Sequence, residues 1–128
     1  MDDKTFSLSQ LQPFLQMHPG RGTLRVQVSV GDGAFPVVQA AVEVFVLLDG
    51  ERIPLYRRYT DRSGIVEGLI LPAGPTAGTQ QQSTAAESVT YYQVDVFHSG
   101  YLPYPRQRVE IYDGIETILP VTLRPVLR

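Results

Sequence analysis

The chain has 128 residues, of which 43% are hydrophobic and 19% charged, values that are ordinary for one globular domain. A domain of this length buries roughly two-thirds of its unfolded surface, so it needs no disulfide or metal to fold. There is no cysteine, which excludes disulfides, thiolate nucleophiles and Cys-ligated zinc. The net charge is −2 and no block of like charge occurs, which argues against nucleic-acid binding.

Two features of the sequence bear on location. The start of the chain, Met1 to Phe6, is acidic and lacks the apolar run of a secretory signal. The longest unbroken apolar stretch, Val44 to Leu48, is too short to cross a bilayer. From both features we expect a cytoplasmic protein with no membrane partner.

Residues 1–22 differ in composition from the rest and predict an N-terminal arm or short helix ahead of a domain over residues 23–125. The segment is rich in Gln and dotted with Leu and Phe. Pro13 would remove a backbone donor inside a helix, so we expect the helix to begin near Pro13 and to end at Gly20. Its apolar side chains, Phe14 among them, would then dock on the domain.

From Thr23 onward, apolar and polar residues alternate with the period of two that is typical of half-buried strands. Turn signals about every ten residues divide this region into short segments, which predicts an all-β antiparallel sandwich. Pro54 favours an edge position for the strand that contains it. The seven predicted strands cover residues 23–30, 40–48, 53–59, 65–71, 89–97, 104–111 and 116–123.

The connections between the strands carry recognisable turn chemistry. Asp49-Gly50 and Asp113-Gly114 predict hairpins, because Gly and Asp tolerate the positive φ angles of tight turns. In the segment Thr60 to Gly64, Asp61 can cap a turn with its carboxylate and Gly64 can take a positive φ, which predicts a turn that returns the third strand to the fourth. Residues 73–88 form a long polar loop of small residues, which we expect to be mobile.

No catalytic, cofactor or metal site is predicted, so we expect a protein that is not an enzyme. The two histidines, His18 and His98, cannot supply a three-His metal site. Ser99 follows His98, but neighbouring strand residues point to opposite faces, and no strained G-x-S-x-G turn occurs. Three carboxylates gather near one predicted hairpin, where turn chemistry explains them: Glu110, Asp113 and Glu116.

The outer face of the second strand is unexpectedly apolar. Phe45 and Leu47 lie on the face opposite to the predicted core residues of that strand, so we expect the arm or a partner to cover them. Aromatic residues on later strands could bind a peptide or a glycan. The predicted interaction surface comprises Phe14, Phe45, Leu47, Tyr91, Phe97, Tyr101 and Tyr104.

Four segments in order resemble the carboxypeptidase regulatory-like domain. They are Pro36-Val37-Val38-Gln39-Ala40-Ala41-Val42-Glu43-Val44, Thr60-Asp61-Arg62-Ser63-Gly64, Leu71-Pro72-Ala73, and Tyr92-Gln93-Val94-Asp95-Val96 with Gly100-Tyr101. The resemblance covers about residues 22–125. It implies a transthyretin-like, seven-stranded Greek-key sandwich.

A narrower resemblance rests on three further segments: Phe14-Leu15 leading to Pro19, Gly22-Thr23-Leu24, and the stretch from Ile111 to Val121. These are similar to the version of the domain that accompanies clostridial spore cortex-lytic proteins and their peptidoglycan-associated relatives. The hydrolase itself is missing from this chain. The resemblance therefore implies a non-catalytic accessory module and carries over no catalytic residue.

Two activities of related sandwiches do not fit the residues. Transthyretin-like hydroxyisourate hydrolases end in a Tyr-Arg-Gly-Ser tail, whereas this chain ends Arg124-Pro125-Val126-Leu127-Arg128. Adhesins of the collagen-binding B type cross-link a Lys to an Asn, but this chain has no Asn and its only Lys is Lys4. We expect a structural or protein-interaction module with an unknown protein partner or self-association; the alternative is an accessory domain that binds carbohydrate or peptidoglycan.

Overall fold

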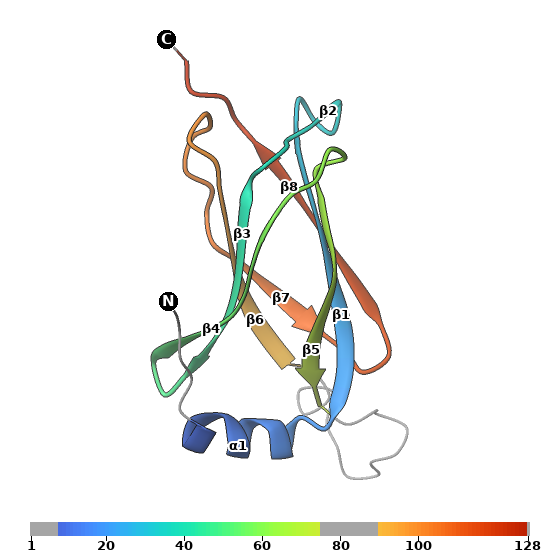
Figure 1. The fold of residues 1–128 in the computed structure, drawn as a ribbon, viewed down its shortest axis with the longest axis vertical. Helices are drawn as coiled ribbons and strands as arrows, with labels where there is room; N and C mark the ends of the chain where they lie inside the picture. The colour runs from blue at the N-terminus through green and yellow to red at the C-terminus, as the bar shows by residue number, and fades with distance from the viewer. Residues whose placement is uncertain (1–7, 75–89, 128) are drawn as a thin grey trace.

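Residues 8–74 and 90–127 are described by a computed structural model, which shows one helix at the end of a two-layered β structure (Figure 1). Side chains are described from residue 13 onward. The elements in chain order are α1 (Leu8–Met17), β1 (Gly20–Val30), β2 (Phe35–Pro36), β3 (Ala41–Leu48), β4 (Glu51–Tyr59), β5 (Ile65–Ala73), β6 (Thr90–Phe97), β7 (Gln107–Ile111) and β8 (Glu116–Leu123).

The strands form two sheets, which confirms the all-β sandwich. One sheet has the order β4-β3-β6-β7 and is antiparallel throughout. In the other sheet, β1 pairs with β5 and β2 in antiparallel fashion and with β8 in parallel. Because β1 residues 23–27 pair with both β5 and β8, those two strands lie on opposite edges of β1. The expectation of a purely antiparallel sandwich is therefore wrong at β8.

The turn at Asp113-Gly114 explains the parallel pairing. It carries the chain from β7 in one sheet to β8 in the other, so these strands do not form the predicted hairpin. Gly114 N donates to Arg21 O at 2.8 Å, and Thr23 N donates to Ile115 O at 3.0 Å. These bonds hold the turn against the start of β1, so β8 leaves it in the same direction as β1.

The core lies between the sheets and consists of alternate residues of the facing strands. Leu24, Val26 and Val28 of β1 are at most 1% exposed. Tyr92 is the largest of the fully buried side chains, and its hydroxyl donates to Pro72 O at 2.5 Å, which links the two sheets. Burial raises the pKa of this hydroxyl, because the low-dielectric surroundings disfavour the phenolate.

Helix α1 is longer than predicted. It begins at Leu8 and contains Pro13, which lacks the backbone donor of a helix interior. Docking offsets that loss: Phe14 is buried, and its ring meets the Tyr92 ring edge-on with centroids 6.2 Å apart. The helix ends at Met17, short of the predicted Gly20, and the next residue closes this end because His18 Nδ1 donates to Phe14 O at 2.7 Å. Gly20 already belongs to β1.

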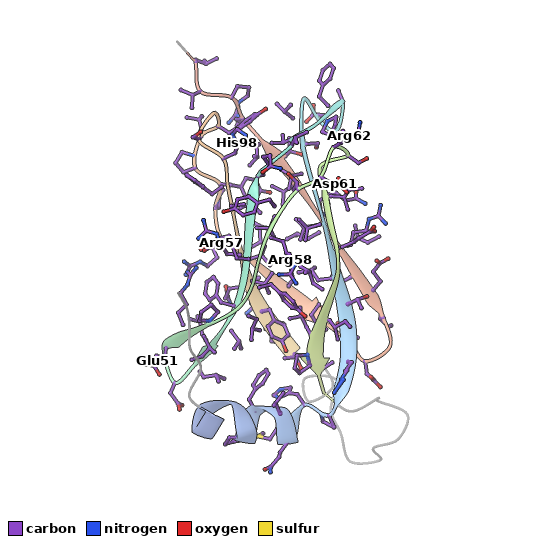
Figure 2. The ribbon with its side chains drawn as sticks, in the orientation of Figure 1. Glu51, Arg57, Arg58, Asp61, Arg62 and His98 are labelled. Atoms are coloured by element: carbon purple, nitrogen blue, oxygen red, sulfur yellow. The ribbon has the colours of Figure 1, made fainter. Side chains whose placement is uncertain are left out.

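The turn from Thr60 to Gly64 connects β4 in one sheet to β5 in the other, so the two strands that it joins are not paired with each other. Asp61 Oδ1 accepts from Ser63 N at 2.8 Å and from Ile65 N at 3.0 Å, and Gly64 has φ of 75°. Asp61 is thus the turn-forming residue that the sequence predicts. It lies at the end of the molecule opposite to α1 (Figure 2).

Other local predictions have mixed outcomes. Asp49 and Gly50 have φ of 53° and 78° and join β3 to β4 in the predicted hairpin. Pro54 lies in β4, an edge strand as predicted. The expected loop at residues 73–88 falls almost entirely outside the described residues. Within the described part of the chain, no helix is long and apolar enough to span a membrane.

Candidate interaction surface

The outer face of the β4-β3-β6-β7 sheet gathers arginines and aromatic rings. Strand register places Tyr59, Ala41 and Phe97 in one row across the sheet and Arg57, Glu43 and Asp95 in the next. We call this surface the arginine face and define it by Ala41, Glu43, Phe45, Leu47, Arg52, Arg57, Tyr59, Tyr91, Asp95, Phe97, Arg106, Arg108 and Glu110.

A chain of ion pairs crosses the middle of the arginine face. Glu43 Oε2 accepts from Arg57 Nη1 at 2.9 Å, and Glu43 Oε1 accepts from Arg52 Nη2 at 2.8 Å. Arg52 Nη1 reaches Asp95 Oδ2 at 3.3 Å, and Asp95 also accepts from Arg106 at 2.9 and 3.1 Å. Five side chains, from β3, β4, β6 and the segment just before β7, are therefore tied into one network.

The network covers Phe45, which is only 1% exposed. The guanidinium carbon of Arg52 lies 3.8 Å from the centre of the Phe45 ring, and that of Arg106 lies at 4.7 Å. The sequence predicts that the arm or a partner covers Phe45; the described residues show instead that Arg52 and Arg106 of the same domain lie over the ring. Two cations stack on the ring, an arrangement that the ring quadrupole favours.

Asp95 is the carboxylate that holds the two cations above Phe45. The hydrogen bond with Arg106 is the largest influence and lowers the pKa of Asp95 below its ordinary value of 3.8; burial opposes it, and the hydrogen bond with Arg52 and the charges of both arginines lower the pKa further. Asp95 thus stays ionised under mildly acidic conditions, and the network persists with it.

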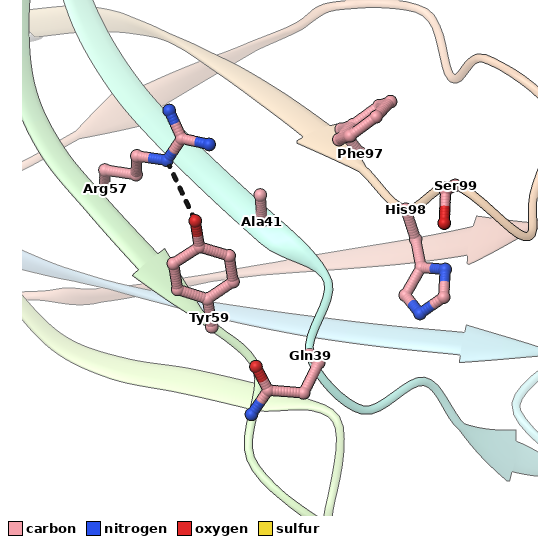
Figure 3. Close-up of a pocket in the computed structure, with 7 residues that line it drawn as sticks. All are labelled: Gln39, Ala41, Arg57, Tyr59, Phe97, His98 and Ser99. Atoms are coloured by element: carbon pink, nitrogen blue, oxygen red, sulfur yellow. Dashed lines mark hydrogen bonds between the residues drawn. The ribbon is translucent and has the colours of Figure 1, made fainter.

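A slot opens at the end of the arginine face, over the small side chain of Ala41 (Figure 3). Tyr59 stands on one side and Phe97 on the other, with 51% and 66% of their surfaces exposed. The slot has a volume of about 200 Å³, and its remaining lining residues are Gln39, Arg57, His98 and Ser99. Three strands and two adjoining turns therefore contribute to one opening.

The remaining predicted surface residues divide into two groups. Leu47 and Tyr91 are 47% and 40% exposed, and Arg108 lies 4.6 Å from the centre of the Tyr91 ring. Tyr101 and Tyr104 are partly buried against the core, contrary to the expectation of exposed rings. Phe14 is buried beneath α1, where it serves docking of the helix.

Nothing in the described residues is arranged for metal binding or nucleophilic catalysis. No group of three His, Asp or Glu side chains comes together within residues 8–74 and 90–127. His98 Nδ1 accepts from the Gly100 backbone N–H at 3.0 Å and is not bonded to Ser99. The expectation that the chain is no enzyme stays a prediction.

The sequence pattern did not predict that Tyr59 and four arginines belong to this surface; the arginines are Arg52, Arg57, Arg106 and Arg108. A bulge in β4 explains why they were missed. It shifts the alternation between Arg52 and Arg57, so a simple period of two does not place Arg52, Arg57 and Tyr59 on the same face. A signal was visible in composition, since only one of the 11 basic residues is Lys and the others are Arg.

No family model matches the sequence, and no curated protein matches it. Solved structures do match. The Bacillus anthracis TIE protein superposes with a TM-score of 0.57 at 18% identity, over 84% of this chain and 17% of that one. GBS52, the minor pilin of Streptococcus agalactiae, gives 0.54 at 16% identity, over 85% and 46%. The chain thus spans less than half of either protein, and the likeness shows a shared β-sandwich fold.

Proposed function

We propose that the chain is a non-catalytic structural module that binds another protein, or a second copy of itself, through the arginine face. The observation that carries this proposal is the combination of exposed aromatic rings with pre-ordered arginines on one face. Arginine and tyrosine dominate the residues that contribute most to protein interfaces, whereas lysine is depleted there.

Two arginines are already ordered in the free protein, which further supports a binding role for this face. Arg52 and Arg106 are already held by two carboxylates and stacked on a ring, so a partner that docks on them immobilises little further. The two structural neighbours, a TIE protein and a minor pilin, support the choice of a structural role. The finer family, a carboxypeptidase regulatory-like domain with transthyretin-like topology, is part of the same proposal.

The test compares two surfaces of the same molecule. Tyr91→Ser combined with Phe97→Ser removes two exposed rings from the arginine face, and Ile118→Ser, at a residue 52% exposed on the other sheet, is the matched control. Each exposed substitution changes stability by about 0.5 kcal/mol or less. We expect capture of a partner from cell extract, or self-association by light scattering, to be lost in the double variant and kept in the control.

Equal capture by both variants would overturn the proposal. The alternative, binding of peptidoglycan associated with spore or cell-wall machinery, would place the same exposed rings against a sugar. Sedimentation with purified peptidoglycan separates the two: protein that pellets with the glycan, and loses this in the double variant, would favour the alternative.

A further inference from the structure

The slot over Ala41 is surrounded by hydrogen-bond donors. Arg57 Nε donates to the Tyr59 hydroxyl at 3.3 Å, so the hydroxyl acts as an acceptor there and its own proton is free for another group. Arg57 pairs with Glu43 through Nη1, so its ion pair in the network does not use Nη2. In Figure 3 the guanidinium extends from β4 toward the Ala41 side of the slot.

The opposite wall adds donors of its own. His98 Nδ1 accepts from Gly100 N, so the proton of the neutral ring lies on Nε2. The Ser99 hydroxyl is a further donor. Among the described residues that line the slot, none is a carboxylate. Donors thus outnumber acceptors, which is the composition expected around an anionic or acceptor-rich group.

Gln39 is positioned at the slot by its backbone. It has φ of 62°, a left-handed conformation that side-chain-bearing residues seldom adopt. Buried Thr60 imposes it: the Thr60 hydroxyl donates to Val37 O at 2.6 Å and accepts from Ala40 N at 2.9 Å, while Gln39 N donates to Thr60 O. Non-glycine residues in this conformation concentrate at binding sites.

The volume limits what can enter. Pockets for whole small molecules span about 300–1,000 Å³, whereas the slot has about 200 Å³, room for one side chain. Two strand spacings separate Tyr59 from Phe97, about 10 Å, so the methylenes of a flexible side chain fit between the rings.

We propose that the slot binds the carboxylate side chain of an acidic segment in a protein partner. Arg57 and the Tyr59 hydroxyl, which lie together on one wall, hold the carboxylate, and the two rings flank its methylenes. The surroundings favour a negative group, because the arginine face has four arginines and only three carboxylates (Glu43, Asp95 and Glu110). Its charge is therefore positive, whereas the net charge of the whole chain is −2. This inference rests on the proposed function and names the partner chemistry.

The test is a titration of the full chain, followed by amide NMR, with the peptide acetyl-Gly-Glu-Gly-amide. We expect shifts confined to residues 39–41, 57–59 and 97–99 and at least fivefold weaker binding of the matching Gln peptide. Arg57→Gln should weaken binding of the Glu peptide at least fivefold. Ala41→Leu fills the slot without removing a donor and should abolish the shifts, whereas Arg108→Gln, beside Tyr91, should leave them unchanged.

Equal binding of the Glu and Gln peptides, or shifts that persist in Ala41→Leu, would overturn the slot proposal. Shifts at the same residues with N-acetylglucosamine, and none with the Glu peptide, would also overturn it and favour a glycan site. The capture experiment tests the proposed function independently of the slot. If that function is wrong, the Tyr91→Ser and Phe97→Ser double variant still captures the partner. If the Glu peptide causes no shifts but the double variant loses capture, the slot proposal is wrong and the proposed interaction function is still supported.

Discussion

Thr60 shows how one buried hydroxyl can fix the backbone beside the candidate binding slot. Its side chain is 1% exposed and serves as donor to Val37 and acceptor from Ala40. These bonds hold the connection between β2 and β3 against the end of β4. Gln39 takes its left-handed backbone within that connection, so the geometry of the slot depends on a residue that does not line it.

We expect Thr60→Val to lower the free energy of unfolding by about 2 kcal/mol, because it leaves a buried carbonyl and a buried N–H without partners at nearly constant volume. Urea denaturation measures the loss. Thr60→Ser keeps the hydroxyl and should cost clearly less. If Thr60→Val were as stable as the wild type, the hydroxyl would not fix this region.

Asp95 gives the ion-pair network a defined pH dependence. Its pKa is lower in the folded chain than the ordinary value of 3.8, so its contribution to stability is present above that value and is lost as the pH falls through the folded pKa. We expect Asp95→Asn to cost up to about 1 kcal/mol at pH 7, since the network is partly exposed.

The difference in urea midpoint between the wild type and Asp95→Asn should shrink as the pH is lowered from 5 to 2. Arg124→Gln, outside the network, should show no such convergence. A difference that stays constant over this range would mean that the charge of Asp95 contributes nothing to stability.

At the scale of elements, Phe14 is the buried side chain of α1 among residues 13–17, the part of the helix whose side chains the structure describes. Phe14 is 8% exposed, stacks on His18 with ring centres 4.2 Å apart, and contacts Tyr92. We expect Phe14→Ala to cost about 3 kcal/mol, near the lower end for buried aromatic residues, because the site lies at the edge of the core. Amide hydrogen exchange of α1 should rise together with the loss of stability.

Met17 on the same helix provides the matched control, since its side chain is 72% exposed. Met17→Ala should leave both the urea midpoint and the exchange of α1 unchanged within about 0.5 kcal/mol. Equal effects of the two substitutions would show that α1 is held by its backbone and not by Phe14.

The elements also show what a sequence can predict. The alternation in β1 and the Asp49-Gly50 hairpin are local signals, and both were predictable because period and turn chemistry act within a few residues. The parallel pairing of β8 with β1 is not local: it depends on Asp113-Gly114 being held by Arg21, about ninety residues earlier.

The candidate site was predictable in part for the same reason. Alternation placed Leu47, Tyr91 and Phe97 on the outer face of their strands, and all three are exposed there, Leu47 without the predicted cover in the described residues. It also assigned Phe45 to that face, but it could not reveal that guanidinium groups from β4 and from the segment before β7 would cover the ring. Cover of this kind arises from side chains that meet across strands, which no linear pattern contains.

For the whole molecule, the two outer faces differ in kind. Among residues 8–74 and 90–127, the outer face of the β1 sheet shows the ion pair between Arg25 and Glu67 at 3.2 Å beside scattered apolar side chains. The arginine face has a continuous network flanked by exposed rings. This difference is why we propose the arginine face as the binding surface.

Site-specific photo-cross-linking in the native cell extract tests this assignment most directly. A photoreactive phenylalanine replaces Phe97 in one variant and Ile118 in another, and both positions are more than half exposed. We expect covalent adducts, with a partner or with a second copy, from position 97 and none from position 118. Adducts from position 118 alone, or from neither position, would contradict the arginine face as the site of binding.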